Sequence, residues 1–87
     1  MKKARRLFDH RLETIRRVIR SCQTIEQLET SYSWGGTVLY NLGTLLRRQG
    51  GPFASLFAYF YTPRYLNRLF EYYLERELEL AGFLPVR

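Results

Sequence analysis

The repeat of large side chains between Thr24 and Gly51 constrains the fold of this chain more than any other feature. Residues that share one face of a helix recur at alternating spacings of three and four. This stretch follows that alternation without a gap, through Ile25, Leu28, Tyr32, Gly35, Leu39, Leu42 and Leu46. The pattern predicts one long amphipathic helix around which the other segments pack.

Both ends of this helix carry boundary signals. Thr24 and Gln27 match a capping box, in which the Thr hydroxyl accepts from the backbone N–H of Gln27 and the Gln side chain reaches back to the N–H of Thr24. At the other end, Arg47 and Arg48 complement the negative end of the helix dipole, and the Gly-Gly-Pro sequence at 50–52 ends the helix. The sequence therefore predicts a helix over about 25–49.

Glycines interrupt the middle of this predicted helix. The pair Gly35-Gly36 could bend it or break it, since each mid-helix glycine costs about 1 kcal/mol relative to alanine. The apolar phase continues unchanged across the pair, so we expect a bent but unbroken helix. Gly36 and Gly43 are seven residues apart, and we expect them to leave a shallow groove where another helix crosses closely.

Helical patterns also flank the central stretch. An amphipathic helix ending near Ser21 is predicted before it, after a loose basic arm at 1–6, from Phe8, Leu12, Ile15, Ile19 and Cys22. After it, FASLFAYFY at 53–61 predicts a short aromatic helix lying across the others. Thr62-Pro63 then predicts the start of a last helix that stops at Gly82, with Phe83 in a capping contact and a tail at 84–87. The fold class is all-α: one domain over 1–87, with three main helices and one short helix.

Charge is unevenly distributed along the chain, whose formal net charge is +6. Residues 1–20 contain eight Lys and Arg against two acidic residues, and 71–79 contain four Glu against one Arg. A basic cluster suits the phosphate backbone of nucleic acid, which requires positive charge without a strict spacing. The predicted nucleic-acid-binding residues are Lys2, Lys3, Arg5, Arg6, Arg16, Arg17 and Arg20.

Three glutamates of the last predicted helix, Glu71, Glu75 and Glu79, follow one another at intervals of four. Like charges at this spacing repel weakly. We interpret them as a solvated face. Two alternatives stay open: they pair with the arginines of the first helix within one chain, or they do so between chains.

The aromatic residues predict a surface for a protein partner or a homo-oligomer, because the chain holds seven Tyr, six Phe and one Trp, more than a small core encloses. Arg47 and Arg48 border the aromatic segment and could stack on its rings. The predicted partner-binding residues are Trp34, Arg47, Arg48, Phe57, Tyr59, Tyr61 and Tyr65. Peripheral association of 53–61 with a membrane surface, flanked by Arg47, Arg48 and Arg64, is a further alternative.

Catalytic and metal-binding signatures do not emerge from the sequence. His10 is the single histidine, and Cys22 completes an apolar stripe as a core residue. The glycine spacing matches neither a phosphate-binding loop nor a dinucleotide fingerprint. We therefore expect a non-enzymatic protein without a metal or cofactor, with no secretory signal and no membrane-spanning helix.

The segment Ile19-Arg20-Ser21-Cys22-Gln23-Thr24-Ile25-Glu26-Gln27-Leu28, followed by Trp34, resembles small uncharacterised helical proteins encoded by phages, including single-stranded DNA phages. The resemblance covers about residues 19–34 and implies a viral or prophage origin. It also implies a compact binding protein in the cytoplasm of a bacterial host. The leading hypothesis is nucleic-acid or acidic-surface binding by the basic first helix. The alternative is a phage inhibitor or scaffolding protein that self-associates through its aromatic residues.

Overall fold

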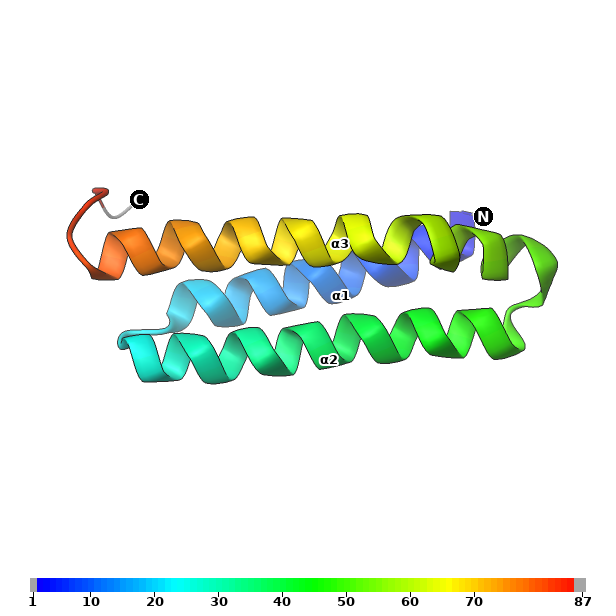
Figure 1. Cartoon of the computed structure of the whole chain (residues 1–87), viewed down its shortest axis with the longest axis horizontal. Helices are drawn as coiled ribbons and strands as arrows, with labels where there is room; N and C mark the ends of the chain where they lie inside the picture. The colour runs from blue at the N-terminus through cyan, green and yellow to red at the C-terminus, as the bar shows by residue number, and fades with distance from the viewer. Residues whose placement is uncertain (1, 86–87) are drawn as a thin grey trace.

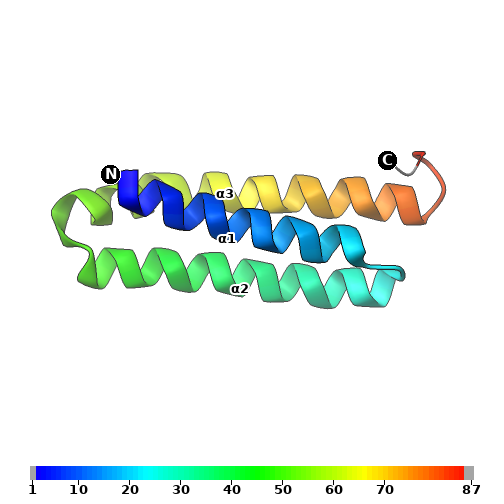
Figure 2. The same ribbon diagram turned by 180° about the vertical axis from the view of Figure 1, so that it is seen from behind.

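Three long helices side by side make up the protein in a computed structural model that describes residues 2–85, with the backbone alone for Lys2. They are α1 (Lys2–Ser21), α2 (Ile25–Gln49) and α3 (Gly51–Leu80). α1 and α3 run in the same direction, and α2 runs against both (Figures 1 and 2). The Cα atoms span 45 × 19 × 16 Å, so the bundle is a rod. Because no strand occurs within residues 2–85, the all-α prediction is confirmed.

The apolar faces of the three helices meet along the axis of the rod. The side chains that are fully buried come from all three helices: Phe8, Ile15, Ile19, Leu28, Leu39 and Leu69. The predicted apolar stripe of the first helix is confirmed in full, since Leu12 and Cys22 are buried with these residues. Apolar residues spaced three and four apart along each helix therefore form a single continuous core.

α2 continues through Gly35-Gly36, so the prediction of an unbroken helix is confirmed. The glycines that admit a close neighbour are, however, not the predicted pair. A Cβ on Gly35 would lie 2.5 Å from Cγ2 of Ile15, and one on Gly43 would lie 2.5 Å from Oγ1 of Thr62. Gly36 faces open space. The expected groove at Gly36 was wrong, because Gly35, one residue earlier, is the one in phase with the core face.

The start of α2 follows the predicted capping pattern with one change. Oγ1 of Thr24 accepts a hydrogen bond from the backbone N–H of Gln27 at 3.2 Å, as expected. The side chain of Gln27 accepts from the N–H of Gln23 at 2.9 Å, one residue earlier than a capping box requires. At the other end, the N–H of Gly50 donates to the carbonyl of Leu46 and closes the last turn.

The last two predicted helices are one helix. α3 passes through Pro63, so Thr62 is not an N-cap and the separate short aromatic helix was wrong. An internal proline lacks an N–H and crowds the carbonyl four residues before it, which favours a break. Tertiary packing outweighs this preference here, because a continuous helix holds both Phe57 and Tyr65 against Phe8 of α1.

The ends of the chain differ from the predictions in smaller ways. α1 begins at Lys2, so residues 2–6 are helical and do not form the predicted loose arm, whose first residue lies outside the described residues. Ala4 is buried and extends the apolar stripe by one turn. At the other end, the N–H of Gly82 donates to Glu79 and that of Phe83 to Leu78, the pattern of a Schellman cap. The predicted stop at Gly82 is confirmed. The Phe83 side chain is exposed, so these backbone bonds hold the end without the expected ring contact.

Candidate nucleic-acid interface

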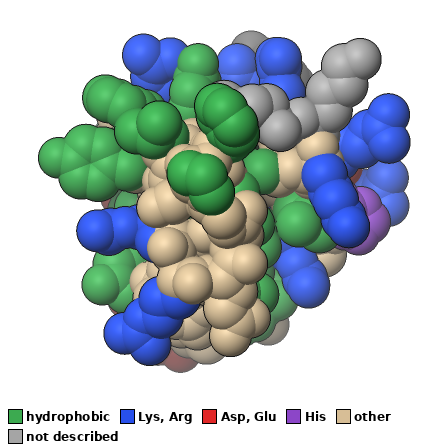
Figure 3. Space-filling model, turned by 90° about the vertical axis from the view of Figure 1, so that its right-hand side faces the viewer, with side chains coloured by type: hydrophobic (Ala, Val, Ile, Leu, Met, Phe, Trp, Pro, Cys, Tyr) green, Lys and Arg blue, Asp and Glu red, His purple; other side chains and the backbone are tan. Residues whose placement is uncertain are grey.

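The sign of the net charge changes along the rod, near the level where Gly35 of α2 contacts Ile15 and Leu69. We call residues 3–12 and 37–68, which adjoin the α2–α3 turn, the basic half, and residues 13–36 and 69–85 the mixed half. The basic half has eight Lys and Arg against one carboxylate, a formal net charge of +7. The mixed half has four Arg against seven Glu, a net charge of −3. Figure 3 shows the end of the basic half, where Lys and Arg side chains surround a group of apolar ones.

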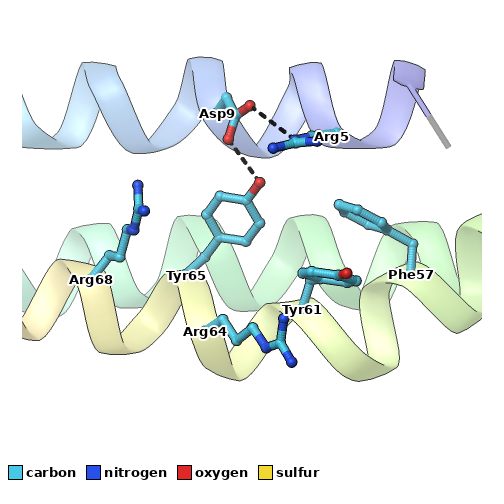
Figure 4. Close-up of a pocket in the computed structure, with 7 residues that line it drawn as sticks. All are labelled: Arg5, Asp9, Phe57, Tyr61, Arg64, Tyr65 and Arg68. Carbon is cyan, nitrogen blue, oxygen red and sulfur yellow. Dashed lines mark hydrogen bonds and ion pairs between the residues drawn. The ribbon is translucent and has the colours of Figure 1, made fainter.

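A hollow of about 290 Å³ opens between α1 and α3 in the basic half. Arg5 lines it from α1, and Arg64 and Arg68 line it from α3. In Figure 4 the Arg64 side chain lies beside Tyr61 and points away from α1. Aromatic side chains and one carboxylate form the rest of the lining: Phe57, Tyr61, Tyr65 and Asp9. Because α1 and α3 run in parallel, arginines from two distant parts of the sequence meet around one space.

Asp9 is the only acidic side chain at this hollow, and the protein itself engages it. The hydroxyl of Tyr65 donates to Oδ1 of Asp9 at 2.7 Å, and Nε of Arg5 lies 3.9 Å from Oδ2. Burial, together with the hydrogen bond to Asp9 and the charge of that carboxylate, raises the pKa of the Tyr65 phenol to about 12. Tyr65 therefore stays a protonated donor at neutral pH. Its bond orients the carboxylate within the wall of the hollow.

The two arginines of α3 differ in their surroundings. The guanidinium of Arg64 lies 4.8 Å from the ring centroid of Tyr61, within the range of a cation–π contact. Arg68 extends from α3 towards α1 beside Tyr65 (Figure 4). Among the described residues of the basic half, the one ion pair is that between Arg5 and Asp9. The positive charge of this half is thus largely uncompensated.

The predicted nucleic-acid-binding residues do not form one surface. Three of them, Lys3, Arg5 and Arg6, are exposed on α1 in the basic half, and the side chain of Lys2 lies outside the described residues. The others, Arg16, Arg17 and Arg20, lie in the mixed half. The carboxylate of Glu13 is 3.4 Å from Arg16 and 3.6 Å from Arg17, so this part of the cluster is partly neutralised.

The mixed half uses its charges to hold the helices together. Arg76 donates from Nε and Nη2 to the carbonyl oxygen of Cys22 at 3.1 and 2.8 Å, and its Nη1 lies 3.6 Å from Glu79. Glu79 is buried, so the interpretation of a solvated glutamate face was wrong at this position. Arg16 and Arg20 line a hollow of about 90 Å³ together with Tyr72, Glu75, Arg76 and Glu79. Opposite charges from α1 and α3 therefore do approach each other within one chain.

Two of the predicted partner-binding residues belong to the core. Phe57 and Tyr65 are buried against Phe8, with ring centroids 5.8 and 4.7 Å away, and so cannot serve as exposed anchors. Tyr61 stacks on Phe57 at 4.6 Å and carries Arg64 above it. Sequence periodicity could not separate these rings, because all three lie close to one face of α3.

The remaining predicted partner-binding residues are exposed. Trp34 lies on α2 in the mixed half, and Tyr59 lies on α3 near the α2–α3 turn. Arg47 sits 5.7 Å from the ring centroid of Tyr59, so the stacking predicted for this arginine is confirmed. Arg48 is exposed beside it. These residues are spread over the rod and form no single predicted patch.

Arg64 and Arg68 were not identified from the sequence as candidate phosphate contacts. Two signals in the sequence point to them: their i, i+4 spacing places them on one face of a helix, and residues 30–70 contain no Asp or Glu. Their proximity to Arg5 depends on the parallel arrangement of α1 and α3, which the sequence does not indicate.

The described residues were predicted to include neither a metal site nor a membrane-spanning helix. Within residues 2–85, no group of three or more His, Cys, Asp and Glu side chains is arranged to hold a metal ion. None of the helices in this range has an apolar stretch that could cross a bilayer. The buried thiol of Cys22 lies 3.3 Å from the carbonyl of Val18 and 3.2 Å from the hydroxyl of Ser31, as expected for a small core residue.

Comparisons of this chain with protein-family models, with curated proteins and with solved structures find no match. The structure shows a small three-helix bundle, and the proposal on function below is based on the geometry and charge of its surface.

Proposed function

We propose that this chain is a non-enzymatic nucleic-acid-binding protein whose basic half contacts the phosphate backbone. The observation that supports it best is the convergence of Arg5, Arg64 and Arg68 from two helices on one hollow. Lys3 and Arg6 extend the positive surface along α1. A phage origin, implied by the resemblance of residues 19–34, is part of the same proposal.

The charge of this half favours an external anion because the fold does not depend on it. Stacked rings join α1 to α3 there, and the single carboxylate is engaged by Tyr65 and Arg5. A phosphate that enters the hollow replaces solvent around the arginines without displacing a network of ion pairs. Guanidinium groups are well suited to this contact, since they donate to phosphate oxygens in a planar, bidentate manner.

We expect the protein to bind nucleic acid independently of the base sequence. Contacts to phosphate fix the position of a protein on nucleic acid without reading its bases. Affinity should therefore be similar for unrelated sequences and should fall steeply as salt rises, since each neutralised phosphate releases counterions.

The test is a salt titration of binding to fluorescently labelled DNA, measured by anisotropy. The double variant Arg5→Glu/Arg68→Glu, which replaces two arginines of the hollow, should weaken binding at least about tenfold and reduce the salt dependence. The matched control is Arg17→Glu/Arg20→Glu, which changes the net charge by the same amount in the mixed half and should have a smaller effect. Circular dichroism checks that both variants are helical. Equal effects of the two variants, or unchanged binding by the first, would contradict the proposal.

A second candidate function, association with another protein chain, is favoured by apolar side chains that α3 exposes along its outer face. Its most specific form is self-association, which the spacing of these side chains supports.

A further inference from the structure

The outer face of α3 carries four large apolar side chains in water. Leu56 and Phe60 are 54% and 58% exposed in the basic half, and Leu74 and Leu78 are 40% and 41% exposed in the mixed half. Asn67, also exposed, lies midway between the two pairs. We call these five residues the α3 stripe. Exposed apolar residues at regular spacing indicate an interaction site more strongly than scattered ones, because together they form a continuous apolar surface.

The spacing of the α3 stripe is symmetrical. Its members follow one another at intervals of four, seven, seven and four residues, so that two apolar residues lie seven and eleven positions on each side of Asn67. At 100° per residue, these intervals keep all five on one side of the helix. That side faces away from α1, which packs against Tyr65 and buries its ring instead.

We propose that a second copy of this chain binds the α3 stripe, with the two α3 helices antiparallel and a two-fold axis at Asn67. In this register Leu56 meets Leu78 of the second copy, and Phe60 meets Leu74. Each contact occurs twice, as a two-fold interface requires. Intervals of four and seven also match the apolar seam of paired helices.

Charge complementarity selects the antiparallel orientation. It places the +7 half of one copy beside the −3 half of the other at both ends of the dimer. A parallel pair would instead place the two +7 halves side by side. Antiparallel pairing also brings the exposed Arg64 level with the exposed Glu71 of the second copy, on the same flank of the stripe. Opposite charges beside a helix–helix seam commonly determine the orientation of such pairs.

The α3 stripe runs along most of the rod. It spans residues 56–78, about 33 Å of helix at 1.5 Å per residue, compared with the 45 Å length of the bundle. α1 lies on the other side of α3 and stays uncovered in the dimer. The dimer therefore does not depend on nucleic-acid binding, and the experiments below contain no nucleic acid.

The first experiment measures mass in solution by sedimentation equilibrium of the whole chain. We expect twice the chain mass of 10.5 kDa at micromolar concentration. Phe60→Glu/Leu74→Glu should lose the dimer and retain the helical circular dichroism. The matched control, Tyr40→Glu/Leu45→Glu, replaces two exposed apolar residues of α2 and should remain dimeric. A monomeric parent chain, or a dimer that survives the α3 variant, would overturn the proposal.

The second experiment tests the register by disulfide formation under mild oxidation. Asn67→Cys should cross-link rapidly, since the two introduced thiols meet at the axis. Glu71→Cys should not, because its thiols lie about 12 Å apart along the antiparallel helices. The parent chain is the control, since its single cysteine is buried. Cross-linking at both positions would show a parallel pair and refute the proposed register.

The third experiment exchanges charges. Arg64→Glu and Glu71→Arg should each increase the dimer dissociation constant several-fold, and the double variant should restore it. Failure of the double variant to restore the dimer would contradict the pairing. If the chain is a monomer that floats with anionic phosphatidylserine vesicles in a manner dependent on Phe60, the α3 stripe is a lipid-binding surface and the dimer proposal is refuted.

Discussion

The basic half and the mixed half of this bundle are joined by different chemistry. In the basic half, Phe8 of α1 packs between the rings of Phe57 and Tyr65 of α3. In the mixed half, the guanidinium of Arg76 links α3 to the end of α1 through the carbonyl of Cys22, beside the buried Glu79. Rings therefore join α1 to α3 in the basic half, whereas a charged side chain joins these two helices in the mixed half, where Tyr32 of α2 also packs on Tyr73 of α3.

This difference explains why a positive charge is available for binding in one half only. Apolar rings need no counter-charges, so the arginines of the basic half can face solvent without carboxylate partners, apart from Arg5 beside Asp9. Charges that are buried or half-buried must be paired, since an unpaired charge out of water is costly. Arg76 and Glu79 meet this requirement together. These two charges of the mixed half are therefore committed to the fold.

The largest expected effect concerns the ring stack. Phe8→Ala should lower the free energy of unfolding by about 3–5 kcal/mol, because it removes a fully buried ring that contacts both Phe57 and Tyr65. Urea denaturation measures it. Leu7→Ala, at an exposed neighbouring position, is the control and should cost less than about 1 kcal/mol. Similar losses in both variants would show that the rings do not hold the basic half.

Substitution of one arginine in each half tests whether Arg76 stabilises the fold and Arg68 does not. Arg76→Met should lower the free energy of unfolding by about 1.5–3 kcal/mol, since it removes both a charged donor to a backbone carbonyl and the ion pair with Glu79. Arg68→Met in the basic half should change it by no more than about 0.5 kcal/mol. Equal costs at the two positions would remove the distinction between structural and available arginines.

Two adjacent glycines at the boundary of the halves should respond in opposite directions. Gly35→Ala should destabilise the bundle by about 1–3 kcal/mol, because its Cβ would meet Ile15. Gly36→Ala should stabilise it by up to about 1 kcal/mol, since that Cβ meets open space and alanine favours the helix. Thermal unfolding of the two variants measures the contrast. A stabilising Gly35→Ala would mean that α1 and α2 are not in close contact there.

The smallest expected effect is a loss of stability in alkali. The pKa of Tyr65 is about 12 in the folded chain and near 10 when unfolded, so above pH 10 the unfolded state releases its proton first and unfolding becomes easier. The contribution lost should reach about 1.4 kcal/mol by pH 11. Tyr65→Phe should show a flatter decline than the parent between pH 10 and 12 in urea denaturation. An identical slope in both proteins would contradict the assignment.

Local signals in the sequence were reliable where one helix face and its caps decided the structure. The unbroken α2, the stripe from Phe8 to Cys22 and the cap at Thr24 follow from spacing and side-chain chemistry within one turn or two. Local signals misled at Pro63, where a strong start signal lies inside a helix. Packing of Phe57 and Tyr65 on the same partner ring outweighs the cost of the proline there.

The amino-acid sequence by itself determined that this chain is helical, where its apolar faces lie, and how much positive charge it holds. Tertiary structure alone decided which charges are available, because that depends on which helices are neighbours. The parallel placement of α1 and α3 brings Arg5 to the same hollow as Arg64 and Arg68, about sixty positions away in the sequence, and places Arg76 against Cys22. Periodicity describes one helix at a time, whereas a charged site between helices depends on their relative position.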